Sequence, residues 1–221
     1  MKAIWFERFG AADQVLSIGD WPTPEPGPGE VLVALRATGI NPSDVKKRAG
    51  AFPDLLDEGP VIPHSDGAGI ITAVGSGVPA SRIGERVFVY QAQYERSHGT
   101  AAQWVAIDST RAPSLPDGTS FEVGACLGIP VLTAHRCVFA DGQVKDQWIL
   151  VTGGAGRVGH YAIQWAHHAG ARVIATASNE ADAASCRSAG AHDVVNHREA
   201  GWGLQVLEHT GGAKIDRAID V

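Results

Sequence analysis

The sequence predicts an α/β protein in which an all-β domain precedes a doubly wound parallel sheet. Three observations support this fold class. Short β-type runs alternate with Gly/Pro turns up to about residue 125, strand and helix patterns alternate after it, and a glycine cluster joins a strand to a helix. We therefore expect one domain over 1–125 and a second over 126–221. The chain reaches Val221 inside a predicted strand, so we expect the second sheet to be incomplete.

The first domain contains short runs rich in β-branched and aromatic residues, typical of half-buried strands. The predicted strands are 2–6, 15–21, 30–40, 68–75, 86–90 and 101–107. Turn-type segments separate them, including NPSD at 41–44, which we interpret as a connection. The segment PTPEPGPGE at 22–30 is too rich in proline for a central strand, so it is predicted to be a surface connection.

The second domain alternates helix and strand patterns. Asn179 is placed to cap one helix and Gly190 to end it, and Gly170 ends the helix before it. The helix ending at Gly170 has one apolar face, made by Val158, Ala162, Trp165, Ala166 and Ala169. The other predicted elements are helices 126–139 and 203–212 and strands 147–151, 172–177, 193–196 and 215–221. Strands this apolar indicate a parallel sheet covered by helices on both faces.

Charge and cysteine content exclude several classes of protein. The formal net charge is -6 and no basic block occurs, so we expect neither a nucleic-acid partner nor a membrane partner. The start, MKAIWFERFG, lacks the apolar stretch of a signal peptide. Three scattered cysteines without a Cys-x-x-Cys pattern indicate neither a disulfide framework nor a structural zinc site. A cytoplasmic location is expected.

A glycine motif follows the predicted strand 147–151. Gly154, Gly156 and Gly159 form G-x-G-x-x-G, and a helix is predicted to open at about Val158. A tight turn needs a residue that tolerates positive φ, and a side chain at the second glycine would block a pyrophosphate. The alternative is a purely structural turn. The predicted cofactor-binding residues of the loop are Gly154, Ala155, Gly156, Arg157, Val158 and Gly159.

The end of strand 172–177 bears on which dinucleotide binds. An NAD site usually places Asp or Glu there, but this chain has Ala177 followed by Ser178 and Asn179. A small residue leaves room for a 2′-phosphate, so NADP(H) is favoured over NAD(H). Glu180 is expected in the first turn of the next helix. Three residues could supply positive charge or donors, or could be ordinary surface residues: Arg187, His197 and Arg198.

The chain resembles the medium-chain dehydrogenases/reductases, and within them the zinc-free, zeta-crystallin-like quinone oxidoreductases. The resemblance covers the whole chain. It rests on the glycine loop and on four further segments, 22–50, PHSDGAG at 63–69, LGIPVLTAHR at 127–136 and SAGAHDVVNHRE at 188–199. It implies a GroES-like β domain, a Rossmann domain and a cleft site between them. It also implies a further C-terminal segment and a homo-oligomer in the full-length form.

The resemblance also addresses a catalytic metal. Zinc-dependent relatives carry a ligand cysteine at or near the place of Asn41 and Gly-His-Glu where this chain reads His64-Ser65-Asp66. No cysteine lies near position 41, and His64 is displaced by one position. A single histidine without further ligands does not make a catalytic zinc site, so no metal is expected. His64 is interpreted as a core or cleft residue.

Individual roles follow from the resemblance alone. Asn41 is expected to face the nicotinamide and the substrate, and Asp44 to hold its loop. Thr133 matches a residue beside the nicotinamide ribose or carboxamide, and Ser178 and His197 match positions near the 2′-phosphate. Two departures are Phe52, where some relatives have a tyrosine, and Asp182, where some have a lysine. The second departure weakens the NADP(H) assignment without reversing it.

These features predict an NADPH-dependent reductase of quinones or other conjugated carbonyls that works without a metal. Asn41 is the first candidate to stabilise the developing oxyanion, although an Asn ahead of Pro42 is also a common turn residue. Tyr90 and Tyr94 are either cleft or packing residues. An enoyl or alkenal double-bond reductase is one alternative, and an NADPH-binding protein without useful turnover is another.

Overall fold

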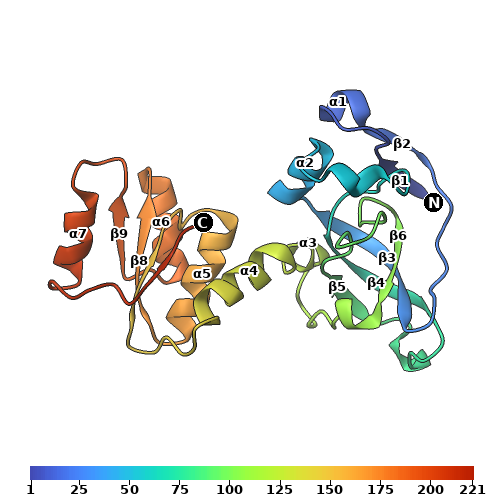
Figure 1. Ribbon diagram of the computed structural model, residues 1–221. Helices are drawn as coiled ribbons and strands as arrows, with labels where there is room; N and C mark the ends of the chain where they lie inside the picture. Colours follow the sequence, from blue (N-terminus) through green and yellow to red (C-terminus); the bar gives the residue numbers. More distant parts are fainter. The chain divides into compact units, whose positions relative to one another are not determined.

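The computed structural model describes residues 1–221 and divides into two compact units, Met1–Ile129 and Pro130–Val221. Figure 1 labels the elements of both, and each unit is described by itself. The predicted fold class is confirmed: the first unit is built on an antiparallel sheet, and the second is a parallel sheet with helices. The functional domains 1–125 and 126–221 stay a prediction.

The first unit is organised around one four-stranded antiparallel sheet in the order β5-β4-β3-β6. Its strands are β3 (Glu30–Gly39), β4 (Asp66–Val74), β5 (Arg86–Val89) and β6 (Trp104–Asp108). Val31 and Val33 of β3 pack with Ile71 of β4 and Val87 of β5 in a fully buried cluster. A separate two-stranded ribbon joins β1 (Lys2–Trp5) to β2 (Ser17–Asp20). All six strands lie within or close to the predicted ranges.

The segment interpreted as a connection at 41–44 instead opens a helix, α2 (Pro42–Arg48). Asn41 is the N-cap, and Pro42 occupies the first turn, where its missing N–H costs nothing. Asp44 accepts a hydrogen bond from the Asn41 N–H at 2.7 Å, and basic residues fill the last turn. The prediction of a turn was wrong because Asn-Pro starts turns and helices alike.

Two further short helices were not predicted, α1 (Ala12–Val15) and α3 (Phe121–Gly124). The predicted helix 126–139 is α4 (Ile129–Phe139), which begins later than expected. Its first residue, Ile129, gives its backbone N–H to the Asp66 carboxylate at 2.8 Å. A buried side-chain acceptor therefore fixes where this helix begins.

The second unit is a parallel sheet in the order β10-β7-β8-β9. The strands are β7 (Trp148–Val151), β8 (Arg172–Ala177), β9 (Asp193–Asn196) and β10 (Arg217–Ile219). The chain runs outward from β7 to β9 and then returns to place β10 on the other side of β7. This reversal is the switch point at which doubly wound sheets bind ligands, outside the carboxyl ends of the strands.

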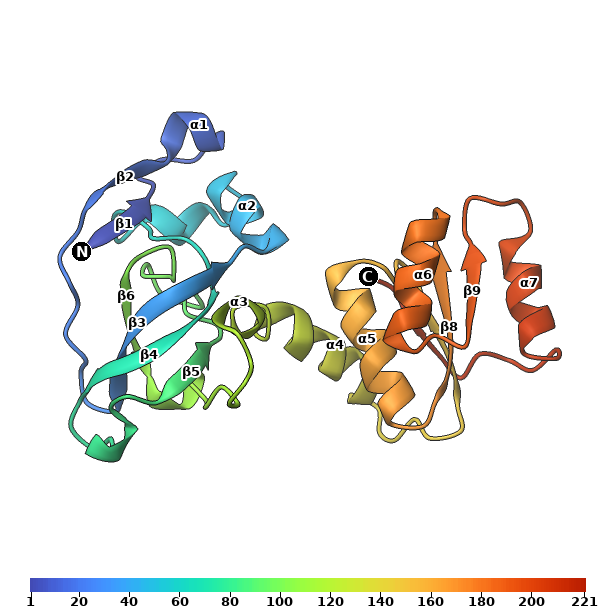
Figure 2. The same cartoon turned by 180° about the vertical axis from the view of Figure 1, so that it is seen from behind.

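Helices cover both faces of this sheet, as predicted. Figures 1 and 2 show α5 (Arg157–His168) and α6 (Glu180–Ala189) on one face and α7 (Trp202–His209) on the other. Ala162 and Ala166 of α5 are fully buried against the sheet. The predicted caps of α6 are confirmed, because the Asn179 side chain accepts from the Asp182 N–H and Gly190 adopts a left-handed φ of 109°.

None of the helices is long and apolar enough to cross a membrane.

Replacing Gly190 by Ala should lower the free energy of unfolding by more than about 2 kcal/mol, because left-handed backbone alone costs roughly 1–2 kcal/mol. The added Cβ would also lie 2.6 Å from Cγ of His167. Gly170→Ala is the matched control, since its φ is 81° but its nearest neighbour is the flexible Lys145 side chain at 3.4 Å. It should cost about 1 kcal/mol. Urea unfolding measures both, and equal losses would contradict the role of the His167 contact.

Candidate functional site

The turn between β7 and α5 is held by the neighbouring strand. The Gly153 N–H donates to the Thr176 hydroxyl at 3.1 Å, and the Gly154 N–H donates to the Thr176 carbonyl at 3.1 Å. Gly153 takes the positive φ, 60°, whereas none of the three motif glycines does. The sequence therefore predicted the need for positive φ correctly but did not identify Gly153 as the residue that meets it.

The three motif glycines have different surroundings. A Cβ on Gly154 would lie 2.8 Å from Sγ of Cys186, and one on Gly159 would lie 2.4 Å from the Gly153 carbonyl oxygen. These two glycines therefore allow the helix to pack against the turn and the sheet. A Cβ on Gly156 would meet only the Gly153 oxygen, at 3.0 Å, and otherwise open space. Gly156 is thus the glycine whose missing side chain leaves room outside the protein backbone.

The open space beside Gly156 lies at the start of α5. Gly156 is the N-cap of this helix, so the amides of Val158 and Gly159 have no acceptor within it. Unpaired amides and the positive end of the helix dipole favour an anion. The turn also follows the carboxyl end of β7, at the switch point of the sheet. The geometry can therefore hold a phosphate group.

The carboxyl end of β8 carries a small polar network. Ala177 is buried, and Ser178 donates its hydroxyl to the Asp182 carboxylate at 3.3 Å. The Asn179 side-chain N–H donates to the same carboxylate oxygen at 2.8 Å. A negative charge therefore lies next to Ser178, which sequence reasoning placed near a 2′-phosphate.

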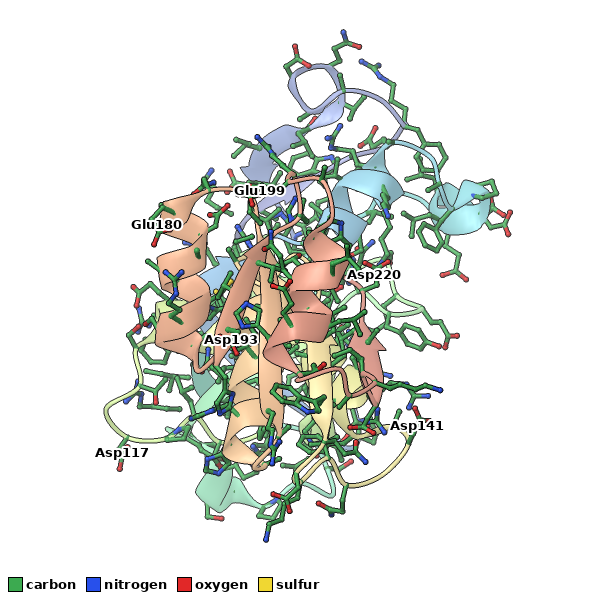
Figure 3. All side chains as sticks on the ribbon, turned by 90° about the vertical axis from the view of Figure 1, so that its left-hand side faces the viewer. Asp117, Asp141, Glu180, Asp193, Glu199 and Asp220 are labelled. Carbon is green, nitrogen blue, oxygen red and sulfur yellow. The ribbon has the colours of Figure 1, made fainter.

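The positive groups predicted for this region are only partly available. The His197 N–H donates to the Ala177 carbonyl at 3.2 Å, so His197 lies beside the end of β8 with an exposed side chain. Arg187 pairs with Glu180 at 2.8 Å and lines an open pocket of about 260 Å³. Figure 3 shows Glu180 and Glu199 at this end of the sheet and Asp141 at the other. The carboxyl end of β8 therefore carries side chains of both charges.

In the first unit, Asn41 and Asp44 lie together, and both are buried. The Asn41 backbone N–H donates to Asp44 at 2.7 Å. Its side-chain Nδ2 donates to Oδ2 of Asp66 at 2.8 Å. Two carboxylates thus hold one asparagine, one through its backbone and one through its side chain.

Burial raises the pKa of both carboxyl groups. The pKa of Asp66 rises to about 6 because burial outweighs the hydrogen bonds from Asn41 and the Ile129 N–H, and the negative charge of Asp44 adds to the rise. Burial raises the pKa of Asp44 against the Asn41 N–H and the positive charges of His64 and Lys47. Asp66 was not among the predicted site residues, although an acid at the start of an otherwise apolar strand was a usable signal.

The neighbouring basic groups are also shifted by burial. Burial lowers the pKa of His64, and the charge of Asp44 opposes the shift. The same two effects act in the same directions on the pKa of Lys47. Lys47 donates to the carbonyl oxygen of Gln93 at 2.9 Å. Lys47 and Gln93 line a pocket of about 670 Å³, whose wall includes Phe52 and the exposed ring of Tyr94.

Thr133 lies in α4 with an exposed side chain, and its predicted role beside a nicotinamide stays a prediction. The predicted loop residues come together around the turn, and Ser178 and His197 come together at the end of β8. Besides Asp66, sequence reasoning missed Gly153 and Thr176. Thr176 is a buried polar residue in the otherwise apolar strand RVIATA, and this was the available signal.

The chain has an antiparallel β unit, followed by a doubly wound sheet with a glycine turn. The resemblance to medium-chain dehydrogenases/reductases implied this architecture. Two family models match the chain: "Alcohol dehydrogenase GroES-like domain" over residues 27–117 and "Zinc-binding dehydrogenase" over residues 158–221. The quinone oxidoreductase of Rattus norvegicus is 35% identical over 225 residues, which cover 100% of this chain and 66% of that protein. The chain thus spans about two thirds of the length of such relatives.

Solved structures agree with this likeness. The quinone oxidoreductase from Coxiella burnetii superimposes with a TM-score of 0.87 at 31% identity, over 100% of this chain and 68% of that chain. A mycobacterial protein solved in complex with NADPH gives a TM-score of 0.83 at 33% identity, over 99% of this chain and 66% of that one. The chain belongs to the quinone oxidoreductase family of the medium-chain dehydrogenase/reductase superfamily.

The name of one matching family model refers to zinc, whereas the absence of a metal is an expectation from the sequence. Asn41 stands in the segment where zinc-dependent relatives have a cysteine, and its side chain hydrogen-bonds Asp66. His64 directs Nδ1 toward the Thr38 hydroxyl at 3.1 Å. No group of three or more His, Cys, Asp or Glu side chains is placed to hold a metal ion.

Asp66→Asn should change how stability depends on pH. The folded protein raises the pKa of Asp66 from 3.8 to about 6, so the folded state binds the proton more tightly than the unfolded state. Wild-type stability relative to Asp66→Asn therefore falls as pH rises through this window, by about 1 kcal/mol between pH 5 and 7.5. Urea unfolding across this range measures the difference.

The control is Asp108→Asn, because hydrogen bonds from the Thr110 hydroxyl and N–H lower the pKa of Asp108. Its difference from wild type should stay flat over the same range. A flat difference for Asp66→Asn as well would contradict the shifted pKa.

Proposed function

We propose that the protein is an NADPH-dependent oxidoreductase that transfers hydride to quinones or other conjugated carbonyls without a metal. The observation that carries the proposal is the open space beside Gly156, at the start of α5 and at the switch point of the sheet. The NADPH-bound mycobacterial relative supports it. When bound, the dihydronicotinamide supplies the hydride.

The residues of the second unit bind and orient the cofactor. Amides at the start of α5, including those of Val158 and Gly159, face the diphosphate, and Gly156 permits its close approach. Ala177 leaves room at the adenosine ribose, and Ser178 and His197 are the predicted neighbours of the 2′-phosphate. Thr133 is the predicted neighbour of the nicotinamide ribose or carboxamide.

Asn41 is the proposed donor to the acceptor's developing negative charge. Its Nδ2 group has two hydrogens, and the hydrogen bond to Asp66 uses one of them. The second hydrogen can stabilise an oxyanion in a site without a metal. Asp44 fixes the Asn41 backbone, so the donor is held before the acceptor arrives. The proton that completes the reduction comes from water in this scheme.

Two alternatives concern the acceptor and the turnover. The same residues suit an enoyl or alkenal double-bond reductase, and NADPH binding without turnover is also compatible with them. NADPH oxidation with a benzoquinone, a naphthoquinone and a 2-alkenal separates the three, because each alternative gives a different pattern of active acceptors. Homo-oligomerisation of the full-length form and a cytoplasmic location stay predictions.

Gly156→Ala should weaken NADPH binding at least tenfold, because the new methyl group occupies the space proposed for the diphosphate. Its stability should change by less than about 1 kcal/mol, because its only close contact is the Gly153 oxygen at 3.0 Å. Fluorescence titration with NADPH measures the affinity, and urea unfolding measures the stability.

Gly154→Ala is the matched control for this experiment. Its methyl group would meet Cys186, Ala175 and Ile163 at 3.0 Å or less, inside the core. It should lower stability more than Gly156→Ala does. Unchanged NADPH affinity in a folded Gly156→Ala variant would contradict the proposed cofactor site.

Asp182→Asn should strengthen NADPH binding roughly fivefold, because it removes a negative charge beside Ser178 while keeping the shape of the side chain. The affinity for NADH, which lacks the 2′-phosphate, should change less than twofold. Parallel titrations with the two dinucleotides check this. An equal gain for both would place the 2′-phosphate elsewhere.

A further inference from the structure

We propose that Asp66 is the positioning residue for Asn41, and that one oxygen of its carboxylate sets the direction of the Asn41 amide while it also fixes the start of α4. This inference rests on the proposed function, in which Asn41 is the donor to the acceptor. It adds a residue whose carboxylate acts on the acceptor through Asn41.

The hydrogen bonds define the direction of the amide. Oδ2 of Asp66 accepts from Asn41 Nδ2 at 2.8 Å and from the Ile129 N–H at 2.8 Å. An ionised carboxylate only accepts, so the nitrogen end of the Asn41 amide must face Asp66. The Asp44 carboxylate holds the Asn41 backbone, and the Asp44 N–H faces the Asn41 side chain in a capping box. Asp66 is the side chain that accepts from Asn41 Nδ2, so it holds the nitrogen end of the donor.

Close packing prevents the carboxylate from moving. Asp66 is 1% exposed, and a Cβ on Gly128 would lie 2.1 Å from its Oδ1. A Cβ on Gly39 would lie 2.3 Å from the Ala125 carbonyl oxygen, so the backbone after α3 packs directly against the end of β3. The glycines at these two positions let the chain before α4 come close to Asp66. The packing around Asp66 therefore fixes the position from which its carboxylate accepts the hydrogen bond of Asn41.

The other oxygen of the carboxylate allows a variant that separates the hydrogen bonds of Asp66 from its charge. Oδ1 of Asp66 is buried and has no hydrogen-bond partner. In Asp66→Asn the amide oxygen can take the place of Oδ2 and accept both hydrogen bonds, with the new nitrogen at the place of Oδ1. Asp66→Asn therefore keeps the positioning and loses the charge, whereas Asp66→Ala loses both.

The first measurement is steady-state reduction of a benzoquinone by NADPH. Asp66→Ala should lower kcat at least tenfold, with the Kd for NADPH within twofold of wild type. Asp66→Asn should keep more than a third of the wild-type kcat. Thr100→Val is the matched control, because it removes a buried hydrogen bond to the Asp66 backbone carbonyl and leaves the carboxylate in place. It should lower stability and leave kcat within twofold.

The second measurement does not require turnover. The side-chain NH₂ signals of Asn41, assigned by their loss in Asn41→Ala, should titrate in wild type with a midpoint near pH 6, since burial raises the pKa of Asp66 to about 6. Asp44, His64 and Lys47 are the other titratable groups of this cluster, and they are unchanged in Asp66→Asn. The titration near pH 6 should therefore disappear in Asp66→Asn although these three groups remain.

The outcomes are separable. A folded Asp66→Ala variant with wild-type kcat overturns the proposal, as does an Asn41 signal that titrates in the same way in Asp66→Asn. If Asp66→Ala does not fold, the Asp66→Asn titration decides. Failure of wild type to bind NADPH would refute the proposed function, and the Asn41 signals would still decide whether Asp66 holds the amide.

Discussion

Close packing of the turn after β7 against the sheet and the neighbouring helices is the constraint on which the second unit depends. Gly154 and Gly159 leave no room for a side chain, and Thr176 of the adjacent strand fixes the turn through its hydroxyl and its carbonyl. Because these contacts hold the turn, Gly156 can leave space outside it without loss of packing. Rigidity and an open anion site therefore come from neighbouring glycines with different roles.

In the first unit, a buried carboxylate holds two segments of the chain in place. The starts of α2 and α4 both present groups that need hydrogen-bond acceptors, and Asp66 supplies one oxygen to both Asn41 and Ile129. Burying a carboxylate is costly, which is why its pKa rises to about 6. A buried acid kept at such a cost fixes one arrangement of its partners, and this is the basis of the positioning role inferred for Asp66.

Much of the fold was predictable because local patterns carried it. The strands of both sheets, the helix after the glycine turn and the caps of α6 were all read from residues within a few positions of each other. Helix α2 was missed because Asn-Pro has the same local meaning in a turn and at a helix start, and only the Asp44 contact distinguishes them. Of the candidate site, the Asn41–Asp44 pair and the residues near Ser178 were predicted from the sequence and their roles stay predictions, whereas Asp66, Gly153 and Thr176 were not predicted.

The sequence by itself determined the order of the elements, the net negative charge and the glycine motif, because these depend on composition and short spacing. Tertiary structure alone decided which glycine takes positive φ, which glycine faces open space and what Asp66 contacts. Asp66 lies 25 residues from Asn41 and 63 residues from Ile129 along the chain. No local pattern encodes contacts at such separations, since they exist only when the β4 strand, the α2 cap and the start of α4 pack together.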